Sequence, residues 1–266
     1  MIASNIQVIS HTIGSLKIEV HPDGRSAGQA AAKAAAKTMR EQASAAREIS
    51  VIFATGASQL ETLRALTEPA GLPWDRVSGF HMDEYIGTGV DHPASFRRYL
   101  RENLTNKVRM MEFSEIDGTS PDPEETCRVY AEKLLAADPQ LCLLGIGENG
   151  HLAFNDPGEA DFNDPLDVKV VRLDRVCRQQ QAAEGWFETL QDVPERAITL
   201  TVPRLFRVPK LIATVPGIRK AAIVRRTLEE PISPQCPATI LRTHPDATLY
   251  LDREAAAELD ETMLSR

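Results

Sequence analysis

The sequence lacks the features of a membrane-embedded, exported or nucleic-acid-binding protein. No apolar run approaches the roughly 20 residues that a membrane-spanning helix needs, and the N-terminus has no basic segment followed by an apolar one. The net charge is −8, and the Lys and Arg residues are scattered, without a basic stripe interleaved with aromatic residues. These absences predict a cytoplasmic protein with neither nucleic acid nor a membrane as its partner.

Several signatures of catalytic sites are also missing. The cysteines are far apart and form no CxxC pair, which favours free thiols in a reducing compartment: Cys127, Cys142, Cys177 and Cys236. No second His or Cys accompanies His151 at metal-ligand spacing, so we expect no metal site. The Gly-Lys-Ser/Thr of a Walker loop and the G-x-S-x-G elbow of a serine hydrolase are both absent.

Apolar strand patterns alternate with helical patterns along the chain. Strands are predicted at residues 15–20, 49–56, 77–83, 141–147, 168–173, 197–202, 210–215 and 247–252. Helices are predicted at residues 26–42, 58–67, 95–104, 121–137, 217–230 and 253–264. With 42% hydrophobic residues and no convincing linker, residues 1–266 are expected to form one α/β domain. Its predicted architecture is an open, mostly parallel sheet with helices on both faces and a Rossmann-like topology.

The stretch GIGENGHLAFNDPG, residues 145–158, contains the G-x-G-x-x-G spacing of a dinucleotide-binding turn. That fingerprint requires the third glycine, here Gly150, to open a helix. Instead His151 follows, and then Asn-Asp-Pro-Gly, which is turn chemistry. We therefore expect no dinucleotide at this turn.

The same turn presents a histidine among polar residues. Glu148, Asn149 and Asp156 lie close to His151 in the sequence. A histidine oriented by an acid or an amide transfers protons near neutral pH, which favours a catalytic role over a structural one.

The strand pattern of residues 49–56 runs directly into a helical pattern. Four small or polar residues form the junction: Thr55, Gly56, Ala57 and Ser58. Small residues allow the backbone to approach a ligand, and free N–H groups at a helix start favour an anion. The alternative is an ordinary turn in which Ser58 and Glu61 form a capping box.

Lys220, in the stretch PGIRK at residues 216–220, falls in the first turn of another helical pattern. The helix dipole disfavours a cation there, unless an anion lies nearby. Lys220 is therefore either a ligand for an anion such as phosphate or an ordinary surface lysine.

In FHMDEYIG, residues 80–87, two adjacent carboxylates follow a strand pattern. If Asp83 and Glu84 are both enclosed, their repulsion raises a pKa and produces a candidate general base. The alternative is a solvated acidic turn. Tyr85 either closes over a ligand or covers the core.

Together these motifs resemble the glucosamine-6-phosphate deaminase family, which is related to the 6-phosphogluconolactonases. The resemblance runs from the first strand to CPATILRTHP near the C-terminus, and its most specific parts are FHMDEYIG and GxxGHLAFNDPG. It implies an aldose–ketose isomerisation coupled to loss of an amine. Glucosamine 6-phosphate and water then give fructose 6-phosphate and ammonia, with no metal or organic cofactor.

The resemblance also implies a role for each motif. The turn at residues 55–58 and Lys220 hold the phosphate, Asp83 is the base at the sugar C2, and His151 assists opening of the pyranose ring. The implied catalytic residues are Asp83, His151, Asn149 and Asp156. The implied substrate-binding residues are Thr55, Gly56, Ala57, Ser58, Glu84, Gly147, Gly150 and Lys220.

The chain departs from the family pattern at three positions. Asn149 replaces an aspartate before the Gly-His pair, and Asp156 replaces a glutamate. In the lid of the site, Gly185 occupies the place of a phosphate-contacting arginine, for which Arg175 and Arg178 are the candidate substitutes. Another phosphosugar, such as galactosamine 6-phosphate or 6-phosphogluconolactone, is therefore an alternative substrate. A non-catalytic sugar-phosphate sensor is a further alternative, and the oligomeric state stays open.

The resemblance bears on regulation as well. Allosteric members bind N-acetylglucosamine 6-phosphate through serines and basic residues after the catalytic loop. The matching positions here are Glu159 and Ala160, and Leu166 and Val168, with Lys169 the nearest cation. We expect no such effector site.

Overall fold

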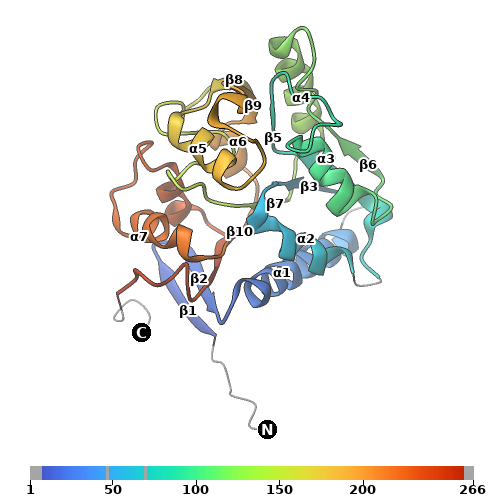
Figure 1. Cartoon of the computed structure of the whole chain (residues 1–266). Helices are drawn as coiled ribbons and strands as arrows, with labels where there is room; N and C mark the ends of the chain where they lie inside the picture. Colours follow the sequence, from blue (N-terminus) through green and yellow to red (C-terminus); the bar gives the residue numbers. More distant parts are fainter. Residues whose placement is uncertain (1–7, 46–47, 69–70, 261–266) are drawn as a thin grey trace.

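The computed structural model describes residues 8–45, 48–68 and 71–260, which form two β-sheets and their surrounding helices (Figure 1). The larger sheet has the strand order β1-β2-β11-β10-β7-β3-β4-β6. Its strands are β1 (Ile9–Ile13), β2 (Leu16–His21), β3 (Ile49–Phe53), β4 (Val77–His81), β6 (Glu112–Ser114), β7 (Leu141–Leu144), β10 (Lys210–Val215) and β11 (Ala247–Asp252). β1 and β2 are antiparallel, whereas the other neighbouring pairs are parallel. The predicted open, mostly parallel sheet is therefore confirmed.

Helices cover both faces of this sheet because both faces are apolar. In β3, Val51 and Phe53 belong to the core on one face and Ile52 to the core on the other. The first face is covered by α1 (Gly24–Ala45), α2 (Leu60–Thr67) and α3 (Phe96–Leu100). The second is covered by α4 (Pro123–Ala137), α6 (Val202–Phe206) and α7 (Ala221–Glu229). Short helical turns join these elements: η1 (Ala57–Gln59), η2 (Trp74–Arg76), η3 (Arg101–Thr105), η4 (Leu190–Asp192), η5 (Ile218–Lys220) and η6 (Pro237–Thr243).

The smaller sheet has the order β5-β9-β8, and both of its strand pairs are antiparallel. Its strands are β5 (Asp83–Tyr85), β8 (Val168–Arg172) and β9 (Arg196–Leu200). The strands predicted at residues 168–173 and 197–202 therefore exist, but outside the parallel sheet. The chain leaves the larger sheet at Met82, whose carbonyl accepts a hydrogen bond from the Leu200 N–H at 3.1 Å. β5 then pairs with β9 instead of extending β4.

The predicted helices differ from the structure in three places. Residues 253–260 form turns after β11, and the rest of the helix predicted at 253–264 lies outside the described residues. The Asp252 carboxylate binds the N–H groups of both Ala255 and Gly217, which holds the start of this segment against another loop. Helices α5 (Arg175–Ala183) and α6, by contrast, were not predicted. They begin after the N-caps Asp174 and Thr201.

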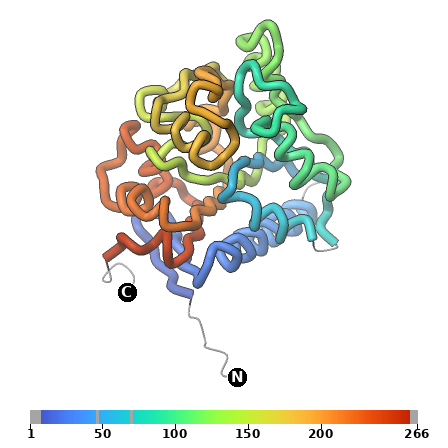
Figure 2. Tube along the Cα trace, in the orientation of Figure 1, coloured from blue at the N-terminus to red at the C-terminus, as the bar shows by residue number. Residues whose placement is uncertain are grey.

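An N-terminal strand and a C-terminal strand lie side by side in the larger sheet. Figure 2 shows the N-terminal strands beside C-terminal segments, in agreement with the parallel pairing of β2 and β11. Among the helices of the described residues, none combines the length and the apolar character needed to cross a membrane.

Candidate active site

A cleft of about 400 Å³ opens at the carboxyl ends of β3, β7 and β10, which are neighbours in the larger sheet. Strands β4 and β6 extend from β3 to one side, whereas β10 and β11 extend from β7 to the other. The border between β3 and β7 is therefore the switch point at which open α/β sheets bind ligands. Eight predicted site residues line the cleft: Thr55, Gly56, Ala57, Ser58, Asp83, Gly147, His151 and Lys220.

The turn after β3 offers backbone N–H groups to this cleft. Gly56 has a φ of 96° and a ψ of 168°, a conformation that residues with side chains rarely adopt. Tyr99 donates a hydrogen bond from its hydroxyl to the Gly56 carbonyl at 2.8 Å, which fixes the orientation of the peptide. Within the described part of the chain, no acceptor binds the N–H groups of Gly56, Ala57 or Ser58. The turn is therefore an open site for an anion.

Side chains hold this turn against the sheet. Gln59 donates from Nε2 to the Ser58 hydroxyl and to the Leu144 carbonyl, both at 3.1 Å. The predicted capping box is wrong, because neither η1 nor α2 has a side-chain N-cap and the Glu61 carboxylate binds Arg64. The Ser58 hydroxyl thus remains at the cleft.

The turn after β10 has nearly the same backbone geometry, with a φ of 93° and a ψ of 152° at Gly217. Its N–H, however, donates to both carboxylate oxygens of Asp252, at 2.9 and 3.0 Å. An internal carboxylate therefore fills the position that an external anion would take. Of the two turns expected to attract an anion, the one after β3 is open.

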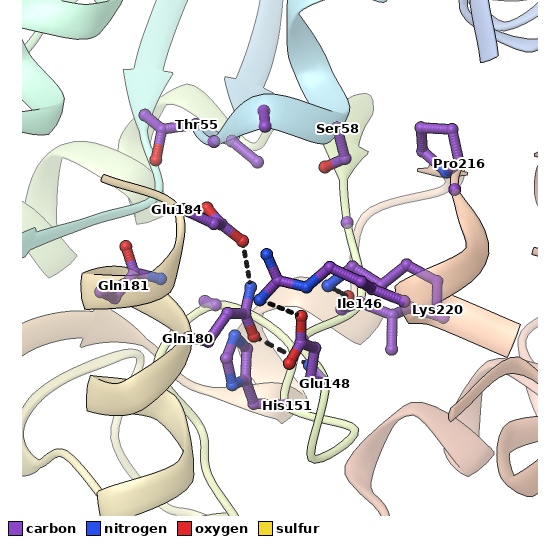
Figure 3. A pocket seen from close by; sticks show the side chains of 18 of the residues that line it. Thr55, Ser58, Ile146, Glu148, His151, Gln180, Gln181, Glu184, Pro216 and Lys220 are labelled. Atoms are coloured by element: carbon purple, nitrogen blue, oxygen red, sulfur yellow. Dashed lines mark hydrogen bonds and ion pairs between the residues drawn. The ribbon is translucent and has the colours of Figure 1, made fainter. Parts of the chain in front are cut away.

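Lys220 contributes its side chain instead. The residue is 9% exposed, and its Nζ donates to the Ile146 carbonyl at 2.8 Å (Figure 3). Burial lowers the pKa of Lys220, because the charged ammonium loses solvation. A buried lysine at the edge of an open anion site is a suitable phosphate ligand.

Asp83 stands where the chain passes from β4 to β5 and is 6% exposed. Burial raises the pKa of Asp83 well above its ordinary value, and the neighbouring Glu84 carboxylate raises it further. The predicted repulsion is therefore present, although burial is the larger cause. A carboxyl group in this environment suits proton transfer at neutral pH.

Glu84 points away from the cleft. Its carboxylate accepts hydrogen bonds from the N–H groups of Tyr85, Phe96 and Arg97 and from the Ser95 hydroxyl, at 2.9–3.2 Å. The predicted substrate contact through Glu84 is thus replaced by a structural role, in which the carboxylate orders the start of α3. Tyr85 is fully buried beside Phe96 and covers the core.

His151 lines the cleft, and its Nδ1 lies 2.9 Å from the Oδ1 of the fully buried Asp156. Burial raises the pKa of Asp156, but the contacts with His151, Asn149 and the Asp174 N–H outweigh this effect and lower the pKa. An anion beside Nδ1 favours the tautomer that carries its proton there and leaves Nε2 free to accept one. Gly147 allows this ring to pack closely, because a Cβ at Gly147 would lie 2.2 Å from Nε2.

Asn149 supports this pair from behind. Its Nδ2 donates to Asp156 Oδ1 and to Asp174 Oδ2, both at 2.9 Å, and its Oδ1 accepts from the His151 N–H at 3.1 Å. Asn149 and Asp156 therefore position the imidazole and do not line the cleft. Gly150 does not line it either. Its φ is 92°, and a Cβ at this position would lie 2.9 Å from Cys236 Sγ, so the turn requires glycine here.

Helix α5 and its C-cap supply cleft residues that were not predicted from the sequence: Gln180 and Gln181 in the helix, and Glu184 at its end. Figure 3 shows the side chains of Gln180 and Glu184 directed toward each other, and Gln180 donates from Nε2 to Glu184 Oε1 at 2.8 Å. Gln180 accepts from the Glu148 N–H at 2.9 Å, so the helix is joined to the glycine turn. Asp174 followed by a polar, helix-forming run was the available signal.

Neither arginine proposed as a substitute for the missing lid arginine reaches the cleft. Arg178 donates to the Val193 and Leu190 carbonyls, and Arg175 is exposed outside the lining. Gly185 has a φ of 81° and is also not part of the lining.

Within the described residues, one group has donor atoms close enough for a metal ion: His151, Asp156 and Cys177, within 4.8 Å of one another. Asp156 already accepts hydrogen bonds from Asn149 and from the Asp174 backbone. Burial raises the pKa of the Cys177 thiol, so metal binding there requires loss of a tightly held proton. The site is better suited to holding the imidazole than to holding a metal.

Comparison with known proteins agrees with this arrangement. Residues 22–250 match the family described as glucosamine-6-phosphate isomerases/6-phosphogluconolactonase. Glucosamine-6-phosphate deaminase of Exiguobacterium sp. is 32% identical over 228 residues, which cover 86% of this chain and 87% of the relative. The deaminase of Listeria monocytogenes is 34% identical over 207 residues, which cover 78% and 86%.

Solved structures share the fold of this chain. A monomeric glucosamine-6-phosphate deaminase has a TM-score of 0.84 at 29% identity, over 91% of this chain and 99% of its own. The 6-phosphogluconolactonase of Trypanosoma brucei shares the fold, with a TM-score of 0.77 at 19% identity over 95% and 100% of the two chains. The chain belongs to the family of glucosamine-6-phosphate isomerases and 6-phosphogluconolactonases.

Proposed function

We propose that the protein is a glucosamine-6-phosphate deaminase, which converts glucosamine 6-phosphate and water to fructose 6-phosphate and ammonia. One observation carries the proposal: a single cleft combines an open anion-binding turn, a buried carboxyl group with a raised pKa and an imidazole held by a carboxylate. The relatives of 32% and 34% identity bear the name of this enzyme.

The phosphate binds at the turn of residues 55–58 and beside Lys220. The open N–H groups after β3 and the buried ammonium neutralise it from two sides of the cleft. Binding there fixes one end of the sugar and leaves the other end toward Asp83 and His151, which line the same cleft.

His151 opens the sugar ring. With its proton on Nδ1, beside Asp156, the imidazole accepts the proton of the anomeric hydroxyl at Nε2 and delivers a proton to the ring oxygen. The hemiacetal becomes an open-chain aldehyde. Asp156 stabilises the transient imidazolium because the two charges are opposite and adjacent.

Asp83 performs the isomerisation. Its carboxylate takes the proton from C2 of the open-chain amino sugar, while a proton of the substrate ammonium group passes to the aldehyde oxygen, which gives an enolamine. Asp83 then returns its proton to C1, so that the nitrogen-bearing C2 becomes an iminium. Water adds to C2, and ammonia leaves to give the ketose. The raised pKa of Asp83 makes it a stronger base than an ordinary aspartate.

The four cysteines are free thiols, which supports a cytoplasmic location for the enzyme. We also propose that the chain acts as one domain. The residues that line the cleft come from segments between the end of β3 and η5, including α5, so a division of the chain within this range would separate parts of one site.

The proposal is tested by a substrate panel. Purified enzyme is supplied with glucosamine 6-phosphate, galactosamine 6-phosphate, 6-phosphogluconolactone and glucosamine, and the ammonia, ketose and acid formed are measured. We expect equal amounts of ammonia and fructose 6-phosphate from glucosamine 6-phosphate, and little reaction with glucosamine. Faster turnover of galactosamine 6-phosphate or of the lactone would assign the alternative substrates instead.

A further inference from the structure

The cleft carries more negative than positive side chains, although its proposed substrate is a phosphate ester. Its carboxylates are Asp83, Glu148, Glu184 and Glu254. Apart from His151, the cations among the described lining residues are Arg219 and Lys220. Because the overall charge of the chain is −8, the long-range field does not attract a dianion either. The site depends on local cations.

Lys220 alone is a weak source of positive charge. Burial lowers its pKa, and one of its ammonium protons is committed to the Ile146 carbonyl at 2.8 Å. Nearby Glu184 and Glu148 favour the charged form, but they also repel a phosphate placed beside it. A second cation is needed to bring a dianion into this cleft.

Arg219 meets the requirement. It precedes Lys220 in η5, lines the cleft, and has a side chain that is 48% exposed. Its Nη2 lies 2.6 Å from Glu148 Oε1. An ion pair at this exposure is weak, so exchanging the carboxylate for another anion costs little. A guanidinium also matches two phosphate oxygens at once, whereas an ammonium acts as a point charge.

The arginines of α5 and α7 closest in sequence to cleft residues, Arg178 and Arg225, have other partners. Arg178 binds the Val193 and Leu190 carbonyls, and Arg225 pairs with Glu258 at 3.2 Å on the exposed face of α7. Neither lines the cleft.

We propose that Arg219 is the second phosphate-binding cation of the cleft, and that Glu148 is its partner in the empty site and is displaced by the phosphate. The inference rests on the proposed function, since the phosphate is that of the proposed substrate. It assigns Glu148 a negative contribution to affinity: it holds Arg219 in place but competes with the ligand.

The experiment measures affinity for inorganic phosphate by calorimetry and KM for glucosamine 6-phosphate. The variants are Arg219→Ala, Arg219→Lys, Glu148→Gln, the Glu148→Gln/Arg219→Ala double variant and, as the matched control, Arg225→Ala. We expect Arg219→Ala to weaken phosphate binding and raise KM by roughly 10- to 100-fold. Arg219→Lys gives an intermediate loss, and Arg225→Ala leaves both quantities unchanged.

The double variant shows whether the phosphate displaces Glu148 from Arg219 or whether the Glu148 carboxylate only repels the phosphate. Glu148→Gln tightens phosphate binding when Arg219 is present, and most of that gain disappears when Arg219 is alanine. An equal gain in both backgrounds overturns the displacement, and wild-type phosphate affinity in Arg219→Ala overturns the whole inference. If the wild-type enzyme releases no ammonia while Arg219→Ala still weakens phosphate binding, the proposed function fails and the phosphate site stands.

Discussion

The side-chain amide of Asn149 donates a hydrogen bond to the buried carboxylate of Asp156, at 2.9 Å. The same Nδ2 also reaches Asp174 at 2.9 Å, so one amide joins two carboxylates behind His151. An aspartate at position 149, as the family pattern would have it, could not donate these bonds. The amide is therefore matched to the presence of Asp174 in this chain.

We predict that Asn149→Asp destabilises the fold and lowers turnover. The substitution removes two donated hydrogen bonds and adds a third carboxylate, which together cost roughly 2–4 kcal/mol. Urea unfolding and the rate of ammonia release measure the two effects. Asn163→Asp adds the same charge on an exposed loop and is expected to change neither. Equal stability of Asn149→Asp and wild type would mean that the bridging amide is unimportant.

The sequence predicted which strand ends carry binding turns, but it did not predict which distant side chains contact those turns. The turns at residues 55–58 and 216–220 were identified as sites for an anion because strand, small residues and helix follow one another locally. Nothing local indicated that Asp252 fills the second turn, since Asp252 comes 35 residues after Gly217. Long-range partners of this kind follow from topology, which a single sequence does not display.

The same limit explains why neither the orientation of Glu84 nor the presence of α5 was predicted. The adjacency of Asp83 and Glu84 correctly predicted a raised pKa. It did not show which carboxylate faces the cleft, because that depends on the start of α3. Helix α5 was not predicted because its polar sequence lacks a long apolar stripe. The cleft residues Gln180, Gln181 and Glu184 were therefore not predicted either.

Lys220→Ala should weaken phosphorylated ligands far more than their dephosphorylated forms. A charge-assisted contact of this kind contributes roughly 1.5–3 kcal/mol, or about 10- to 150-fold in affinity. Burial lowers the pKa of Lys220, so its ammonium group loses its proton at a pH below the ordinary 10.5. The contribution of Lys220 to phosphate affinity is therefore present at low pH and disappears as the pH rises through that lowered pKa. Inhibition by fructose 6-phosphate and by fructose provides the comparison. Lys37→Ala, on the exposed side of α1, is the control, and equal losses for both ligands would make Lys220 merely structural.

His81 should make the stability of the protein depend on pH. Burial, with a further contribution from Arg97, lowers the pKa of His81 from 6.5 to about 3. The unfolded chain therefore takes up a proton below about pH 6.5 that the folded protein refuses. The stability that depends on a neutral His81 is therefore fully present above about pH 6.5. As the pH falls from there toward 3, the free energy of unfolding decreases by roughly 1.4 kcal/mol per pH unit.

In His81→Gln, the slope of the unfolding free energy against pH between about 4 and 6 should be smaller than in wild type. The difference corresponds to one fewer proton taken up on unfolding. The glutamine oxygen replaces Nδ1 as the acceptor of the Ile116 N–H. Chemical denaturation across this pH range measures the slope, and His92→Gln, on an exposed loop, should leave it unchanged. An unaltered slope in His81→Gln would show that His81 is not the group responsible.

The enzyme should show hyperbolic kinetics that N-acetylglucosamine 6-phosphate does not change. Lys169, the cation nearest to the expected effector positions, is paired with Asp164 at 2.9 Å and donates to the Glu159 carbonyl at 2.6 Å. The acid at Glu159 repels a phosphate, and the aliphatic Leu166 and Val168 cannot neutralise one. Initial rates over a wide substrate range, with and without the effector, test this. Sigmoidal curves that become hyperbolic with the effector would disprove it.

The central claim, that Asp83 is the base at the sugar C2, is tested most directly by comparing turnover and binding in Asp83→Asn. Amide and carboxylate are nearly isosteric, but the amide cannot take the C2 proton, so the rate of ammonia release should fall about 100- to 10,000-fold. Calorimetry should show that the phosphosugar affinity stays within a few-fold of wild type. An Asp83→Asn enzyme that retains most of its ammonia release would contradict the account, because the proton would then be removed by another group.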